Sequence, residues 1–184
     1  MRLFCLICLS GLIASCGSYD RPARDVAVAE ELHQKAVSLL DEDPERAEEL
    51  LQRALEYDLY HGSAHNNLGV LLLNKGLLYQ AAQEFEWARK LLPGHPEPRT
   101  NLAIALHRGG RTGDALESCQ SALEVRPFYI GALQARAMIN LLNGNEYPDL
   151  DEDLLAIRSR GENSHWRRWA HGQLLKREGP QAPE

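Results

Sequence analysis

The chain has 184 residues, of which 25% are charged, and its formal net charge at pH 7 is −6. This length suits one folded domain rather than several. The acidic balance argues against nucleic acid as a partner, because binding phosphates requires clustered lysine and arginine side chains.

Residues 1–15 have the composition of an export signal. A positively charged start is followed by an almost wholly apolar stretch over residues 3–14. Spanning a bilayer takes about 20 apolar residues, so this shorter stretch predicts a signal peptide rather than a membrane helix. Its end, Ile13-Ala14-Ser15-Cys16, resembles the lipobox of bacterial lipoproteins. The resemblance implies cleavage before Cys16 and lipid attachment to Cys16. The alternative is a conventional signal peptide in which Cys16 is an ordinary cysteine.

Residues 16–25 form a short linker that is rich in turn-forming residues. At about 3.3–3.6 Å per residue, its extended reach is only about 30 Å, which would keep the folded part close to a membrane surface. Gly17 follows the cysteine, where many Gram-negative lipoproteins retained in the inner membrane have aspartate. The resemblance therefore implies a lipid-anchored protein of the bacterial cell envelope, at the outer membrane and facing the periplasm.

Residues 26–61 carry the pattern of a helix pair. Apolar positions recur at helical spacing on both sides of a short polar turn, and they are Leu32, Ala36, Leu39, Leu40, Ala47, Leu51 and Ala54. Pro44 suits the first turn of the second helix. The turn is one residue shorter than in the two units that follow, so this pair is predicted to be a degenerate copy of them.

Residues 62–95 and 96–129 are two copies of one 34-residue pattern. Small, apolar or helix-ending residues recur in register: Leu68, Gly69, Gly76, Ala81, Phe85, Ala88 and Pro93 correspond to Leu102, Ala103, Gly110, Ala115, Cys119, Ala122 and Pro127. A period of this length indicates an array of helix pairs, each of which buries its apolar face against its neighbours.

The residue types at these positions have physical reasons. Gly76 and Gly110 lie between two helical stretches, where a left-handed residue commonly ends a helix. Pro93 follows the second stretch and cannot continue it. Gly69 is expected to face Ala81, because small residues let two antiparallel helices pack about 8–10 Å apart.

Residues 130–161 are predicted to form a second degenerate pair. Ala137 and Gly144 keep the register, but Asp149 and Asp153 fall where a small and a bulky apolar residue are expected. The second helix of this unit is therefore expected to be shifted or imperfectly packed.

Residues 162–178 are predicted to form a capping helix and residues 179–184 a tail. Asn163 or Ser164 can cap the start of that helix. Its apolar face consists of Trp166, Ala170 and Leu174. The end of a repeat array needs such a cover because no further repeat stacks on it.

The spacing of residues 62–129 resembles the tetratricopeptide repeat family, whose unit is a helix–turn–helix of the same length. The resemblance implies an all-α fold. We expect a right-handed α-solenoid of about three to four helix pairs, followed by the C-terminal capping helix.

In this family the first helix of each unit lines a concave groove that binds an extended peptide or another protein's helix. Transferred to this sequence, the resemblance implies a groove lined by Asn66, Asn67, Val70, Asn74, Thr100, Asn101, Ile104, Arg108, Gln134 and Met138. Asn67 and Asn101 match the recurrent asparagine that bonds the ligand backbone. The alternative is that these two amides only tie one helix to the next.

No pattern of catalytic, cofactor-binding or metal-binding residues is recognisable in the sequence. His61 and His65 are four residues apart, but Gly62 follows the first and no third ligand accompanies them. We therefore expect structural histidines, with no metal and no cofactor. Cys119 lies on a buried helical stripe, where a free cysteine commonly serves as a small hydrophobe.

These observations predict a binding protein rather than an enzyme. We expect a membrane-anchored adaptor that binds a partner protein or peptide and assists the assembly of an envelope, pilus or secretion complex. The alternative is a self-associating structural lipoprotein, in which a second copy fills the groove.

Overall fold

The computed structural model describes residues 23–178, so the signal peptide, Cys16 and the tail at 179–184 lie outside the described residues. Within that range the chain is helical and contains no strand. Its helices are α1 (Val26–Val37), α2 (Pro44–Tyr57), α3 (Gly62–Asn74), α4 (Leu78–Leu91), α5 (Glu97–Arg108), α6 (Thr112–Val125), α7 (Ile130–Leu142), α8 (Leu150–Arg160) and α9 (Ser164–Glu178).

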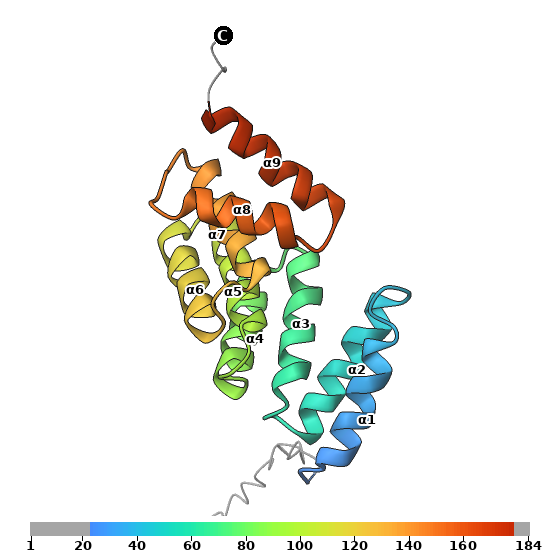
Figure 1. Cartoon of the computed structure of the whole chain (residues 1–184). Helices are drawn as coiled ribbons and strands as arrows, with labels where there is room; N and C mark the ends of the chain where they lie inside the picture. The colour runs from blue at the N-terminus through green and yellow to red at the C-terminus, as the bar shows by residue number, and fades with distance from the viewer. Residues whose placement is uncertain (1–22, 179–184) are drawn as a thin grey trace, which may run out of the picture.

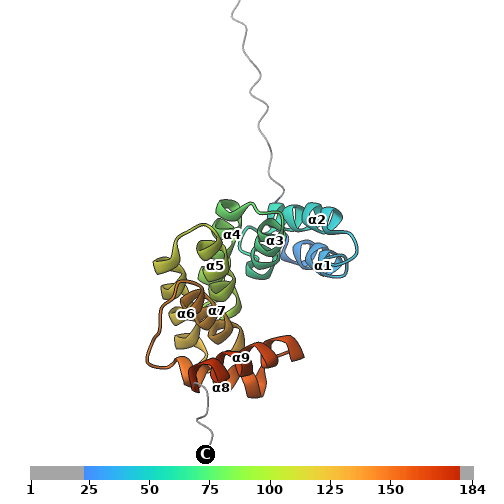
Figure 2. The same cartoon turned by 90° about the horizontal axis from the view of Figure 1, so that it is seen from above.

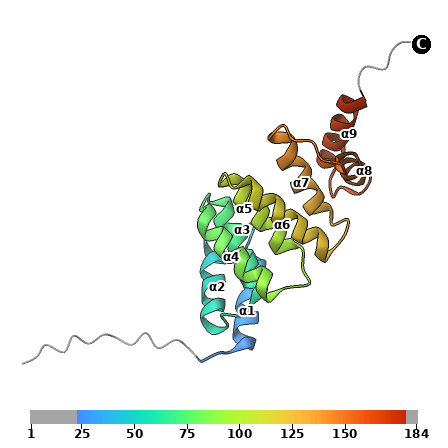
Figure 3. The same ribbon diagram turned by 90° about the vertical axis from the view of Figure 1, so that its left-hand side faces the viewer.

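The helices stack in chain order as antiparallel pairs, which gives a solenoid with α1 and α9 at opposite ends (Figures 1 and 3). Seen from above, the array bends into an arch (Figure 2). The first helices of the pairs, α1, α3, α5 and α7, lie on the inner side of this arch, and α2, α4, α6 and α8 lie on the outer side. The predicted all-α solenoid is confirmed.

The core runs along the whole array in two clusters, because each helix pair leaves an apolar face for the next. One cluster of buried side chains joins α1 to α6 and reaches Ala135 and Ile139 of α7. A second cluster joins α6 to α9. Many members are alanines with no exposed surface, and such small side chains allow the helices to approach closely.

The turns inside the second, third and fourth pairs use left-handed glycines, as the sequence predicts for Gly76 and Gly110. Their φ angles are 77° and 80°, and Gly144 in the third such turn has a φ of 68°. These angles are easy for glycine and unfavourable for other residues. Each glycine therefore reverses the chain directly after the first helix of its pair.

Gly69 makes room for the aromatic ring of Phe85 on α4. A Cβ atom at Gly69 would lie 2.6 Å from Cε1 of Phe85, and both Phe85 and Ala81 are fully buried. In the next unit the equivalent positions hold Ala103 and Cys119, which are also fully buried. The large Phe85 on α4 is thus paired with Gly69 on α3, whereas the smaller Cys119 on α6 leaves room for the methyl group of Ala103 on α5.

The unit at 130–161 departs from the others in its second helix. α4 begins 16 residues after the start of α3, whereas α8 begins 20 residues after the start of α7. Asp149 lies before α8 and is exposed. Asp153 is buried, and Arg136 of α7 donates to its two carboxylate oxygens at 2.8 and 2.7 Å. The second helix is thus shifted, which is one of the two outcomes expected, and at Asp153 a buried ion pair takes the place of an apolar side chain.

Tyr147 completes this buried polar cluster. Its hydroxyl donates to Asp153 at 2.5 Å, and the Arg136 guanidinium lies over its ring at 5.1 Å. Burial and the neighbouring Asp153 carboxylate raise the pKa of Tyr147. Burial alone would lower the pKa of Arg136, but its bonds to Asp153 outweigh that effect and raise it. Arg136 therefore keeps its positive charge across the physiological pH range.

α9 covers the end of the array as predicted. The Asn163 side chain accepts a hydrogen bond from the Trp166 backbone N–H at 3.1 Å, so Asn163 caps this helix. Ala170 and Leu174 are buried in the second apolar cluster. Arg177 further ties α9 to α8 by donating to Asp151.

Cys119 is a free, fully buried cysteine of α6. Burial raises the pKa of its thiol to about 12, so the reactive thiolate is scarce at neutral pH. We expect iodoacetamide at pH 8 to leave Cys119 unmodified in the folded protein and to modify it in urea, as measured by peptide mass mapping. Modification of the folded protein at the rate of an exposed cysteine would contradict this account.

Candidate interaction surfaces

The inner side of the arch carries a row of hydrogen-bonded polar side chains that crosses three helices. The Asn101 side-chain N–H on α5 donates to Asn66 Oδ1 on α3 at 3.0 Å. The Asn66 amide points to Asn67 Oδ1 at 3.4 Å, and Asn67 Nδ2 lies 3.1 Å from His33 Nε2 on α1. We call Asn101, Asn66, Asn67 and His33 the amide ladder. The 34-residue period aligns it, because equivalent positions of successive units become neighbours.

The sequence left two interpretations of Asn67 and Asn101: they bond a ligand backbone, or they only tie one helix to the next. Both amides do tie one helix to another, as the structural alternative predicts. A side-chain amide offers two donors and a carbonyl with two lone pairs. Among the described residues, the ladder bonds use only part of this capacity. The amides can therefore hold their orientation through each other and still bond a ligand.

The other predicted groove residues divide into three groups. Val70, Ile104 and Met138 are half-buried, so they offer apolar surface. Asn74 and Arg108 are exposed, and Arg108 donates to the Leu73 carbonyl at 3.0 Å.

The remaining two, Thr100 and Gln134, are buried. The Thr100 hydroxyl donates to the Pro96 carbonyl at 3.1 Å within its own helix. Gln134 Nε2 has no hydrogen-bond partner among residues 23–178. We therefore leave both residues out of the inner binding surface.

His61 and His65 form hydrogen bonds with different residues, and each contact has the structural role that the sequence favours. His61 Nδ1 accepts a hydrogen bond from the Ala64 backbone N–H at 3.2 Å and so caps α3. His65 is buried, and its two ring nitrogens lie 2.6 Å from Glu84 Oε2 and 2.9 Å from the Leu59 carbonyl oxygen.

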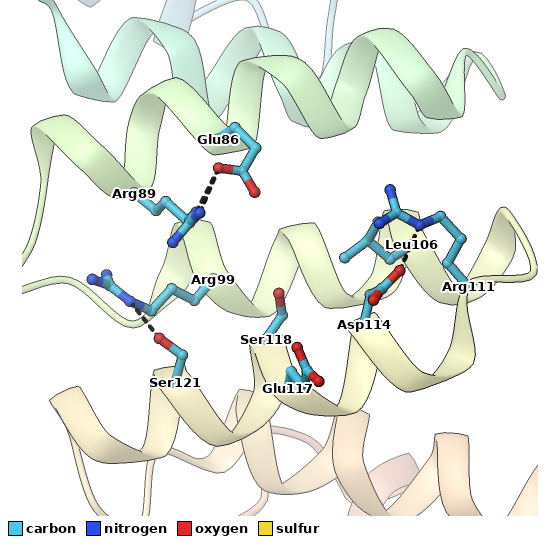
Figure 4. A pocket seen from close by; sticks show the side chains of 9 residues that line it. All are labelled: Glu86, Arg89, Arg99, Leu106, Arg111, Asp114, Glu117, Ser118 and Ser121. Atoms are coloured by element: carbon cyan, nitrogen blue, oxygen red, sulfur yellow. Dashed lines mark hydrogen bonds and ion pairs between the residues drawn. The ribbon is translucent and has the colours of Figure 1, made fainter.

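The outer side of the arch has a hollow that the sequence analysis did not predict (Figure 4). Its volume is about 340 Å³, and it lies between α4 and α6 with α5 beneath. The lining residues are Glu86, Arg89, Arg99, Leu106, Arg111, Asp114, Glu117, Ser118 and Ser121. We call this feature the outer groove.

Most charges of the outer groove are paired within one helix turn. Arg89 bonds Glu86 at 2.7 Å, and Arg111 bonds Asp114 at 2.6 Å. Arg99 instead donates to the Ser121 hydroxyl at 3.1 Å, as the dashed lines in Figure 4 show. The lining carries three arginines and three acidic side chains, so the groove has no strong preference for either sign of charge.

Two exposed aromatic residues flank an adjoining hollow of about 270 Å³. Tyr79 is 76% exposed and Trp87 is 42% exposed, both on α4. Sequence reasoning missed them because their helical positions face away from the predicted groove. Their aromatic character was the available indication, since such residues are enriched where proteins bind one another.

Among residues 23–178, no helix is both long and apolar enough to cross a bilayer. A search of curated proteins found no match.

The sequence model of the tetratricopeptide repeat matches residues 41–96 and 79–130. Solved structures share the fold. A Thermus thermophilus protein, TTC0263, is 20% identical with a TM-score of 0.68, over 82% of this chain and 83% of that one. A tetratricopeptide repeat protein from Parabacteroides merdae is 25% identical with a TM-score of 0.65, over 83% and 61% of the two chains.

A third solved structure holds a bound peptide. The first tetratricopeptide repeat domain of Spaghetti (RPAP3), bound to an HSP90 peptide, is 14% identical with a TM-score of 0.63, over 67% of this chain and 99% of that one. The fold is thus one that elsewhere binds protein segments. The sequence match identifies tetratricopeptide repeats within residues 41–130, and the shared architecture shows that the chain folds as a tetratricopeptide-repeat solenoid.

Proposed function

We propose that this protein is a lipid-anchored adaptor that binds an extended segment of a partner protein on the inner side of its arch and thereby assists an envelope assembly. The observation that supports it best is the amide ladder, which sets polar groups from α1, α3 and α5 in one row. An extended segment presents backbone N–H and C=O groups at regular intervals, and amides can bond both kinds.

Apolar side chains beside the ladder suit the side chains of such a segment. Val70, Ile104 and Met138 come from three successive inner helices and are each half-buried. The bonds within the ladder fix the amides before a ligand arrives, so less conformational entropy is lost on binding. Together, these features favour a partner segment whose backbone bonds the amides and which places one or two apolar side chains against Val70, Ile104 or Met138.

Replacing both Asn67 and Asn101 with alanine tests this proposal. Each lost hydrogen bond costs about 0.5–1.5 kcal/mol, so we expect a lower melting temperature together with at least several-fold weaker partner binding. The partner is first captured from the native envelope, and its affinity for the folded variant is then measured by calorimetry. Gln83→Ala is the matched control, because Gln83 is an exposed amide on α4 outside the ladder.

The two measurements separate the interpretations of the ladder. A lower melting temperature with unchanged affinity would make the ladder a purely structural tie and would contradict the proposed site. Capture of nothing but further copies of this chain would instead favour the self-associating structural lipoprotein.

The anchor rests on Ile13-Ala14-Ser15-Cys16, which lies outside the described residues. Each buried methylene contributes about 0.8 kcal/mol, and stable anchoring takes more than one acyl chain. We expect the wild-type protein to partition with membranes and Cys16→Ser to lose both lipid and processing. An intact mass that shows an unmodified Cys16 in the mature protein would exclude this anchor.

A further inference from the structure

We propose that Glu30, His33 and His61 form a binding site for one divalent transition-metal ion, with Zn²⁺ the best match. Glu30 and His33 are on α1, and His61 directly precedes α3. One potential ligand atom from each residue lies within 4.8 Å of the other two. Two histidines and one carboxylate are a ligand set that Zn²⁺ commonly takes, and such sites leave a fourth position to water.

His33 supplies the observation that first points to a ligand. Its Nδ1 atom is buried and has no hydrogen-bond partner among the described residues. The same atom lies 4.0 Å from Glu30 Oε1, and the rings of His33 and His61 are 4.7 Å apart between centroids. A buried polar atom without a partner is costly, and a metal ion at this point would satisfy it.

The surroundings of two ligands fit coordination. As placed, Asn67 Nδ2 lies 3.1 Å from His33 Nε2 and donates to it. Coordination through Nδ1 requires that amide to turn over and give up its 3.4 Å bond from Asn66, after which the Asn67 oxygen accepts the ring proton at Nε2 and leaves the Nδ1 lone pair for the metal. The Gln34 amide donates to Glu30 Oε1 at 2.8 Å and orients that carboxylate. Such outer contacts fix the tautomer and direction of metal ligands.

The protonation states also suit a cation. Burial lowers the pKa of His33, with a further contribution from the neighbouring His61. Hydrogen bonds from Gln34 and His61 lower the pKa of Glu30. At neutral pH the site therefore offers a neutral imidazole and an ionised carboxylate, which are the forms that bind metal.

His61 must rearrange its hydrogen bonds to take part. In the structure its Nδ1 accepts from the Ala64 N–H, so the ring proton is on Nε2 and faces Glu30 Oε2 at 3.0 Å. Coordination through Nε2 moves that proton to Nδ1 and gives up the cap bond to Ala64. The Glu30 side chain is exposed, and its bonds to Gln34 and His61 already hold the carboxylate beside the two rings.

A bound ion would join the first helix pair to the second, because α1 and the start of α3 belong to different pairs. It would also fix His33, the terminal member of the amide ladder. The inference thus adds a metal-dependent tie at the N-terminal end of the inner face. It does not depend on the proposed adaptor function.

Isothermal titration of the purified full chain with Zn²⁺ tests the site. We expect one saturable equivalent that Glu30→Gln or His33→Gln weakens by at least about tenfold, since even outer-contact changes cost 10–100-fold. Glu31→Gln and His95→Gln are matched controls, because both residues are exposed and lie outside the trio. The cysteines at positions 5, 8 and 16 are present in every variant, so differences between variants report on the trio alone.

Co²⁺ provides a second readout that does not depend on stability. The visible absorption bands of bound Co²⁺ depend on its ligands. We expect the same bands in the wild type and both controls, and altered bands in Glu30→Gln and His33→Gln. Circular dichroism confirms that each variant is folded. Equal Zn²⁺ affinity in the wild type, Glu30→Gln and His33→Gln, or no saturable binding by the wild type, would overturn the proposal.

Discussion

Gly69→Leu is expected to destabilise the protein by about 1–3 kcal/mol or more, because it overpacks a closely filled helix crossing. Even a single added Cβ would lie 2.6 Å from a ring carbon of Phe85, which is fully buried. That ring is part of the larger apolar cluster, so moving it aside would disturb its other buried neighbours. Thermal and urea unfolding followed by circular dichroism measure the effect.

Gly113→Leu is the control for this change. Gly113 lies in the first turn of α6, and a Cβ there would meet nothing within 4 Å. We expect its stability to change little, because the same side chain is added without overpacking. A Gly69→Leu variant that unfolds at the wild-type urea concentration would contradict the close packing of α3 on α4.

Asp153→Ala should be at least as harmful, with a loss of about 3–5 kcal/mol, because it leaves a buried arginine without its counter-ion. The Arg136 side chain is only 17% exposed and makes two bonds to Asp153. Combining Asp153→Ala with Arg136→Met removes both charges. The double variant should therefore recover much of the lost stability.

Asp151→Ala on the same helix is the matched control for Asp153. Asp151 pairs with Arg177 at the surface, where its side chain is 61% exposed. Exposed pairs contribute about 0–1 kcal/mol, so this variant should unfold close to the wild type. Equal losses for Asp151→Ala and Asp153→Ala would show that the buried pair has no special role.

The sequence predicted most of the architecture because the repeats depend on local rules. A left-handed residue follows the first helix in the second, third and fourth pairs, and glycine provides it at Gly76, Gly110 and Gly144. The sequence could not place Asp153, since an aspartate at an apolar position gives no indication of its partner. Arg136 lies 17 residues earlier and reaches it only through the fold. Phe128, with a φ of 63°, likewise adopts a left-handed conformation that its residue type does not suggest.

The candidate surfaces were predicted less completely, because they too depend on side chains that only the fold brings together. The period identified the helices that line the inner side, but not which polar side chains would bond each other. Thr100 turned inward to its own helix, and Asn66 became the link between Asn67 and Asn101. The outer groove and the trio at Glu30 combine residues from separate helices, so no spacing in the sequence reveals them.

Photo-crosslinking in the native envelope tests the central claim most directly. A photoreactive amino acid is introduced at Val70 on the inner side, or at Tyr79 or Glu117 on the outer side, in the membrane-bound protein. The account predicts one partner crosslinked from Val70 and absent from Tyr79 and Glu117, with the yield reduced when Asn67→Ala and Asn101→Ala are added. A partner crosslinked from Tyr79 or Glu117 but not from Val70 would move binding to the outer groove and contradict the account.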